Sequence, residues 1–91
     1  MNAGGLWSFR FHPDAQRELR KLDPSVVRLI GKRLHWLTAN ASAVQHLPLR
    51  FDLGGLYKLR AGDWRLIYRL VEDKRVVLVV GLGHRSEVYE P

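Results

Sequence analysis

Two short turn signals constrain the fold of this chain more than any other feature of its sequence. Gly62-Asp63 and Asp73-Lys74 separate three segments, residues 56–61, 64–72 and 75–83. Apolar and polar residues alternate in the first two segments, which is typical of strands that bury one face. Because two-residue connections join antiparallel strands, the C-terminal part of the chain is predicted to form two consecutive β-hairpins.

The N-terminal part predicts one more strand and two helices. Residues 6–12 alternate, with aromatic side chains on one side: Trp7, Phe9 and Phe11. A short helix is expected from Pro13, with apolar residues at helical spacing: Ala15, Leu19 and Leu22. A longer helix is expected from Asp23-Pro24, with an apolar stripe: Val26, Val27, Ile30, Leu34 and Leu37. Residues 40–55 predict a surface connection with room for a short extended piece.

These elements predict an α+β fold of order βααβββ, in which a two-helix hairpin packs on one face of a small, mainly antiparallel sheet. The chain has 91 residues, enough for one core, so residues 1–91 are expected to form a single domain. It has no cysteine, which excludes disulfides, thiolate nucleophiles and cysteine metal sites. Its four histidines lack the spacing of a helical metal site, so neither a metal nor another cofactor is expected.

The charge of the chain indicates what kind of partner it has. Lys and Arg number 15 against 9 Asp and Glu, which gives a formal net charge of +6. Such a surplus favours an anionic partner: a phosphate backbone, an anionic membrane surface or an acidic protein. The sequence has neither the pattern of a signal peptide nor an apolar run long enough to span a membrane. We therefore expect a cytoplasmic protein.

The first hairpin predicts a basic face. A two-residue turn at Gly62-Asp63 places Ala61 opposite Trp64 and Arg60 opposite Arg65. Alternation then collects cations on one face: Lys58, Arg60, Arg65 and Arg69. The other face is apolar and is expected to meet the helices: Tyr57, Leu59, Trp64, Leu66, Tyr68 and Leu70. Like charges directly opposite each other cost a few tenths to about 1 kcal/mol unless an anion lies between them. The basic face is therefore either a phosphate-binding surface or a solvated one that keeps the sheet soluble.

The last strand favours the first of these readings. Residues 76–80 are apolar without interruption, which is typical of a central strand covered on both faces. We expect its outer side to be exposed at Leu78, Val80 and Leu82 and to be covered by a partner. The basic face is therefore expected to bind a partner and not to serve only as a solvated surface.

Residues with the chemistry of RNA cleavage follow this strand. His84, Arg85 and Tyr89 lie within one short segment after Gly81 and Gly83. Cleavage without a metal needs a group that takes the proton of the 2′-hydroxyl, one that holds the charge on the phosphate, and one that protonates the leaving 5′-oxygen. His, Arg and Tyr can supply these three functions. Taken singly, a loop histidine and a tyrosine packed on the sheet edge are the structural alternatives.

The chain resembles the RelE/ParE superfamily of bacterial toxins. The resemblance is carried by residues 55–68, with Gly62-Asp63-Trp64-Arg65 at the hairpin, and by the terminal His84-Arg85-x-x-x-Tyr89. Residues 11–15 are similar to the strand-to-helix entry of these proteins, so the resemblance covers nearly the whole chain. It implies a RelE-like, microbial-ribonuclease-like fold over residues 1–91.

The RelE branch implies a toxin of a type II toxin–antitoxin pair that cleaves mRNA in the ribosomal A site without a metal. Its implied partners are a cognate acidic, RelB-like antitoxin, the ribosome and mRNA. The implied catalytic residues are Arg65 and Arg85, which stabilise the phosphate, and His84 and Tyr89, which share proton transfer. The implied RNA-binding residues are Lys58, Arg60 and Arg69.

Several alternatives stay open from the sequence. The general base is His84 or Tyr89, with Lys58 as the next candidate. The chain departs from the familiar RelE pattern at Leu56, where a lysine is usual, and near Gly83, where an arginine is usual. A ParE-type inhibitor of DNA gyrase on the same fold is the first alternative function. A basic binding module without activity is the second.

Overall fold

The computed structural model describes residues 6–48 and 55–84, and the elements follow the predicted order with one added strand. They are β1 (Ser8–Phe11), α1 (Pro13–Leu19), α2 (Pro24–Ala39), β2 (Leu47–Pro48), β3 (Leu56–Ala61), β4 (Trp64–Val71), the 3-10 turn η2 (Glu72–Lys74) and β5 (Val76–His84). The added strand, β2, is the short extended piece of the long connection. In this part of the chain, no helix has both the length and the apolar character needed to cross a membrane.

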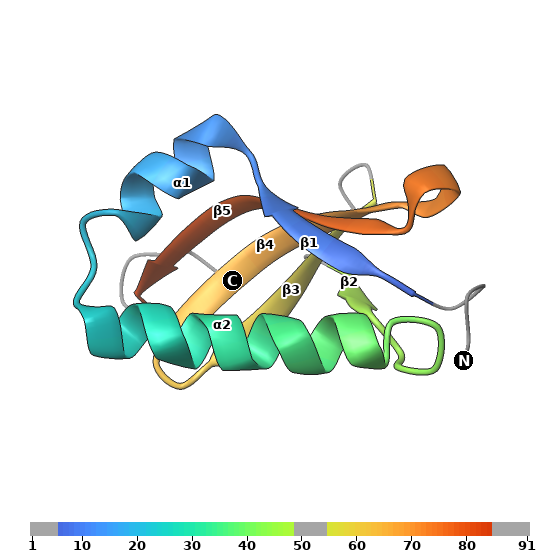
Figure 1. Ribbon diagram of the computed structural model, residues 1–91, viewed down its shortest axis with the longest axis horizontal. Coiled ribbons are helices and arrows are strands. Elements are labelled where there is room, and N and C mark those ends of the chain that lie inside the picture. Colours follow the sequence, from blue (N-terminus) through green and yellow to red (C-terminus); the bar gives the residue numbers. More distant parts are fainter. Residues whose placement is uncertain (1–5, 49–54, 85–91) are drawn as a thin grey trace.

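The strands form one sheet in the order β1-β5-β4-β3-β2, counted over the described residues (Figure 1). The pairs β2-β3, β3-β4 and β4-β5 are antiparallel, whereas β1 runs parallel to β5. Helix α2 runs across one face of the sheet, and α1 lies over the end of β5 (Figure 1). The α+β architecture predicted from the sequence is therefore confirmed.

The β3-β4 hairpin has the predicted register. Ala61 pairs with Trp64 and Arg60 with Arg65, so the connection is the two-residue turn Gly62-Asp63. Gly62 has a φ of 63°, which a side chain adopts only with strain and which a type II′ turn requires at its first central position. A Cβ at this position would lie 2.9 Å from Cδ2 of Leu29 on α2. The hairpin end is therefore closely packed against the helix.

The β4-β5 connection differs from the predicted two-residue turn at Asp73-Lys74. Residues Glu72–Lys74 form a turn of 3-10 helix, and Arg75 closes it with a φ of 54°. The backbone N–H of Arg75 donates to the Glu72 carbonyl at 3.2 Å. The connection has four residues, 72–75, instead of the predicted two, so β4 ends at Val71 instead of Glu72 and β5 begins at Val76 instead of Arg75.

A β-bulge divides β5 into two parts. Tyr68 pairs with Val79 and Ile67 with Gly81, so Val80 is an extra residue without a partner on β4. One extra residue reverses the alternation of every residue beyond it. Leu82 therefore pairs with Leu66 and packs against the core. The expectation that Leu82 lies on the outer face with Leu78 is wrong for this reason.

The core lies between α2 and the sheet. The helix contributes Ile30, Leu34 and Leu37, all at most 1 % exposed. The sheet contributes the buried side chains Leu59, Leu66, Tyr68, Val77 and Val79. Because these positions alternate along each strand, the same sheet leaves its opposite face for other contacts.

A partly buried chain of hydrogen bonds joins the connection after α2 to this core. The Ala41 carbonyl can only accept, so Nε2 of His46 donates to it at 2.9 Å. In the neutral ring the other nitrogen, Nδ1, accepts a hydrogen bond from the Tyr68 hydroxyl at 2.6 Å. Burial and the neighbouring Tyr57 raise the pKa of Tyr68 to about 12, which keeps this hydroxyl protonated as a donor.

Candidate nucleic-acid interface

The outer face of the sheet, opposite α2, collects cationic side chains from three strands. Cross-strand partners share a face, and Arg60 pairs with Arg65, Lys58 with Ile67 and Leu78 with Arg69. The predicted grouping of Lys58, Arg60, Arg65 and Arg69 on one face is thus confirmed. The pairing of β1 with β5 adds Arg10, which lies beside Leu78, and His12 two residues further on. We call the surface formed by these six residues the basic face.

No pattern in the sequence indicates that Arg10 and His12 belong to this face. Their position depends on which strand β1 joins, and β1 could pair with either edge of a hairpin sheet. The structure places it parallel to β5, so that Arg10 lies level with Leu78. The sequence shows that Ser8, Arg10 and His12 share one side of the strand. It does not show with which strand β1 pairs.

Arg60 and Arg65 lie directly opposite each other on the hairpin. The backbone carbonyl of Arg60 accepts a hydrogen bond from Nε of Arg33 on α2 at 2.8 Å. The Arg33 guanidinium in turn stacks 4.6 Å above the ring of Trp36. The helix therefore holds the β3 backbone at the position where the two arginines meet.

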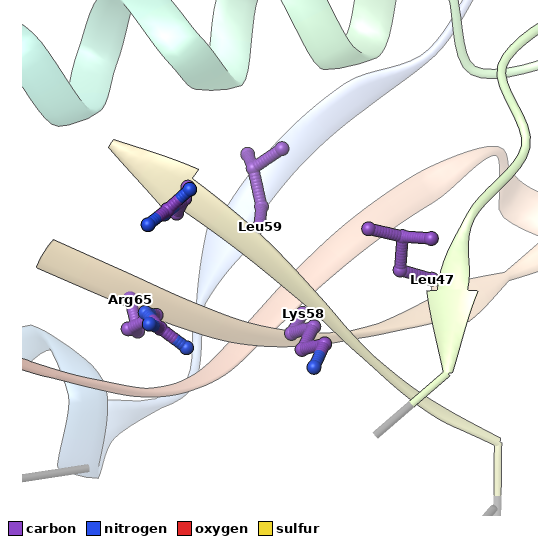
Figure 2. A pocket seen from close by; sticks show the side chains of 5 residues that line it. Leu47, Lys58, Leu59 and Arg65 are labelled. Atoms are coloured by element: carbon purple, nitrogen blue, oxygen red, sulfur yellow. The ribbon is translucent and has the colours of Figure 1, made fainter. Parts of the chain in front are cut away.

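A groove lies along this edge of the hairpin (Figure 2). It has a volume of about 360 Å³ and is lined by Leu47, Lys58, Leu59, Arg60 and Arg65. Lys58 and Arg65 reach it from neighbouring strands, and Leu47 approaches from β2 (Figure 2). The groove thus combines cations with apolar walls, which suits a chain of phosphates and bases.

Glycines lie on β5 beside Arg65. Gly83 pairs with Arg65, and Gly81 pairs with Ile67. Because glycine has no Cβ, no β5 side chain rises next to the Arg65 guanidinium on the basic face. A ligand that contacts Arg65 therefore meets backbone on that side.

His84 lies on the other face from Arg65. It pairs with Trp64, and the two rings meet edge to face with centroids 5.5 Å apart. The bulge at Val80 causes this, because without it His84 would share a face with Leu78 and Arg69. The structure therefore does not bring His84 together with Arg65 and Arg60. Whether His84 takes part in catalysis stays a prediction.

The remaining predicted residues of the site are distributed as follows. Arg69 is exposed on the basic face, four residues along β4 from Arg65. Arg85 and Tyr89 lie outside the described residues, so their predicted roles are not tested. Across residues 6–48 and 55–84, no three His, Asp or Glu side chains gather in a way that could hold a metal ion.

Comparison with known proteins identifies the class of protein to which this chain belongs. Residues 9–89 match the model of the family described as ParE toxin of type II toxin-antitoxin system, parDE. The chain is 28 % identical to toxin RelG of Mycobacterium tuberculosis, covering 91 % of this chain and 95 % of RelG. It is 32 % identical to the mRNA interferase toxin RelE of Escherichia coli K12, covering 87 % of this chain and 85 % of RelE.

A solved structure shares the fold. The crystal structure of the toxin–antitoxin complex RelBE2 of M. tuberculosis contains a chain that superposes with a TM-score of 0.75 at 30 % identity, covering 88 % of this chain and 99 % of that one. The shared fold and the family match define this chain as a toxin of a type II toxin–antitoxin system. Within that class, the chain belongs to the RelE/ParE family.

Proposed function

We propose that the protein is a ribosome-dependent endoribonuclease that cleaves mRNA in the A site by attack of the 2′-hydroxyl, without a metal. The observation that carries this proposal is the Arg60–Arg65 pair, two like charges held opposite each other beside Lys58. Two guanidinium groups on directly opposite residues can both bind one phosphate between them. The relative named mRNA interferase toxin RelE supports the same activity.

Each catalytic role that the reaction requires can be assigned to a residue of this chain. Arg65 holds the phosphate as negative charge develops on it, and Arg85 is assigned the same role. Lys58, Arg60 and Arg69 bind the RNA backbone along the basic face. Proton transfer is assigned to Tyr89, with Lys58 as the alternative base, because His84 packs against Trp64 on the other face.

The partner that controls this activity is an acidic, RelB-like antitoxin in a heteromeric complex. The formal charge of +6 favours an acidic chain. Leu78 and Val80 are half-buried on the outer face, where apolar side chains of such a chain can cover them. The M. tuberculosis structure of a related toxin is itself a toxin–antitoxin complex. Action on ribosomes places the protein in the cytoplasm.

The direct test is cleavage of a defined mRNA on purified ribosomes with the A site empty. We expect cuts within the A-site codon, with EDTA present, and no cuts in the same mRNA without ribosomes. Cutting of free mRNA would remove the ribosome from the proposal. The absence of any cutting by soluble, folded protein would remove the nuclease.

The second candidate function is inhibition of DNA gyrase. The observation that favours it is the match of residues 9–89 to the ParE toxin family model. The same protein preparation tests it in a gyrase supercoiling assay. Loss of supercoiling, without mRNA cleavage on ribosomes, would replace the first function with this one. Antitoxin binding without either activity would indicate a basic binding module.

A further inference from the structure

A second hollow lies on the basic face, away from Arg60 and Arg65. Its volume is about 430 Å³, and it is lined by His12, Asp14, Arg69, Leu78 and Val80. It exists because β1 pairs with β5, which brings the end of β1 next to the bulge. Arg69 lies four positions along β4 from Arg65, a span of about 13 Å. The hollow is thus a separate site on the same surface.

His12 presents a fixed hydrogen-bond donor to this hollow. Its Nδ1 accepts a hydrogen bond from the backbone N–H of Asp14 at 3.1 Å, which caps α1. A ring nitrogen that accepts carries no proton, so in the neutral ring the proton lies on Nε2. The side chain is 46 % exposed, which leaves Nε2–H free to meet a ligand.

Asp14 adds an acceptor to a surface that is otherwise basic. One carboxylate oxygen, Oδ1, pairs with Arg17, and the other, Oδ2, lies 3.8 Å from Nδ1 of His12. A carboxylate repels phosphate, so it does not suit a site for the RNA backbone. The carboxylate can instead accept hydrogen bonds from the N–H groups on the edge of a nucleobase. Such contacts distinguish one base from another, whereas contacts to phosphate do not.

The rest of the hollow fits the other parts of a nucleotide. Leu78 and Val80 are half-buried and offer an apolar surface to the flat face of a base. Arg69 is exposed beside them and can bind the attached phosphate. Proteins recognise single-stranded RNA by splaying out bases and bonding to their edges in this way.

We propose that the hollow at His12, Asp14 and Arg69 is a subsite for one nucleobase of the RNA, next to the nucleotide cleaved at Arg65. His12 donates to the base edge, Asp14 accepts from it, and Arg69 binds the phosphate. The subsite would make cleavage depend on the base at one fixed position from the cut. This inference rests on the proposed nuclease function.

Nucleotide binding tests the subsite without requiring cleavage. The chain carrying Arg65→Ala is labelled for NMR and titrated separately with the four nucleoside 3′-monophosphates and with inorganic phosphate. We expect shifts of the His12 ring and Leu78 methyl signals, with at least about a tenfold difference in Kd between the best and the worst base. Equal shifts with phosphate alone would overturn the proposal in favour of an anion site. No shifts with any nucleotide, but shifts with an antitoxin peptide, would overturn it in favour of a protein contact.

Two variants and a matched control assign the residues. His12→Asn keeps a side-chain cap for α1 while removing Nε2–H, and Asp14→Asn replaces an acceptor oxygen with a donor. Glu18→Gln is the control, because Glu18 also forms an i,i+3 ion pair on α1, with Lys21, and does not line the hollow. We expect each variant to change the base preference of binding at least about tenfold and the control to leave it unchanged. Unchanged preference in both variants would overturn the assignment.

Cleavage mapping on ribosomes then separates this inference from the proposed function. If the wild-type chain cuts, Asp14→Asn should change the base preference at one position while total cutting persists. An unchanged cleavage pattern would sink the subsite and leave the nuclease standing. If the wild-type chain does not cut, the nuclease fails, and the nucleotide titration still decides whether the hollow binds a base.

Discussion

Arg60 and Arg65 face each other across the β3-β4 hairpin, in the register that the two-residue turn at Gly62-Asp63 imposes. The β3 backbone at this point is held by a 2.8 Å hydrogen bond from Nε of Arg33 to the Arg60 carbonyl. The fold therefore holds the two arginines opposite each other at a fixed place. A phosphate between the two guanidinium groups is the simplest use for such a pair.

Replacement of Arg65 should separate activity from stability. Arg65→Ala removes the cation that is proposed to hold the phosphate. We expect cleavage on ribosomes to fall by about 10²–10³-fold, whereas the free energy of unfolding in urea changes by less than about 1 kcal/mol. Arg28→Ala, an exposed cation on α2, serves as the control and should change neither. Growth arrest by Arg65→Ala equal to that of the wild type would remove this residue from the site.

The two proton-transfer candidates can be compared directly. His84 packs on Trp64, on the face away from Arg65. We therefore expect His84→Gln to slow single-turnover cleavage by less than about tenfold, and Tyr89→Phe to slow it by at least that factor. A larger loss in His84→Gln than in Tyr89→Phe would restore His84 as the base. Near-normal rates in both variants would point to Lys58.

Replacement of Gly62 in the turn by alanine should lower the stability of the protein, whereas the same replacement of Gly81 in β5 should not. Gly62→Ala forces a side chain into a φ of 63° and places its Cβ 2.9 Å from Cδ2 of Leu29. We expect a loss of about 1–2 kcal/mol in the free energy of unfolding. Gly81→Ala is the control, because its Cβ would lie 3.8 Å from Cβ of Ile67, an ordinary contact. Equal losses in the two variants, measured by urea unfolding, would contradict the turn assignment.

The Tyr68–His46 hydrogen bond should make stability depend on alkaline pH. The pKa of Tyr68 is raised to about 12 in the folded protein, against about 10 in the unfolded chain. The folded state thus holds this proton more tightly than the unfolded chain does. The contribution of the Tyr68 hydroxyl to the free energy of unfolding is complete below pH 10 and is lost as the pH rises from about 10 to 12. At pH 7, Tyr68→Phe should cost about 1–3 kcal/mol, because Nδ1 of His46 loses its donor.

The measurement is the difference in unfolding free energy between the wild type and Tyr68→Phe at several pH values. We expect this difference to shrink above pH 10. Tyr57→Phe is the control, because it leaves the hydrogen bond between Tyr68 and His46 in place. It removes only the smaller cause of the raised pKa of Tyr68, so it should keep most of the alkaline loss. A difference that stays constant from pH 8 to pH 11 would show that Tyr68 does not titrate in this way.

Local signals in the sequence determined the hairpin and the cations on it. The turn at Gly62-Asp63 sets the register of residues that are close in the chain, and alternation then assigns their faces. The apolar stripe of α2 likewise requires only the helical period, and its members Ile30, Leu34 and Leu37 are buried as predicted. These features follow from short-range geometry, so the sequence suffices for them.

Tertiary structure alone decided which histidine shares a face with the arginines. The pairing of Ser8 with Val76 joins distant parts of the chain, and no local pattern selects that neighbour over another. The bulge at Val80 leaves no signal in the sequence, because the side chains of the apolar run 76–80 are compatible with either face. Together they bring His12 to the basic face and turn His84 toward Trp64. A one-residue shift in a strand reverses every side chain beyond it, which is why alternation along the last strand gave the wrong face for Leu82.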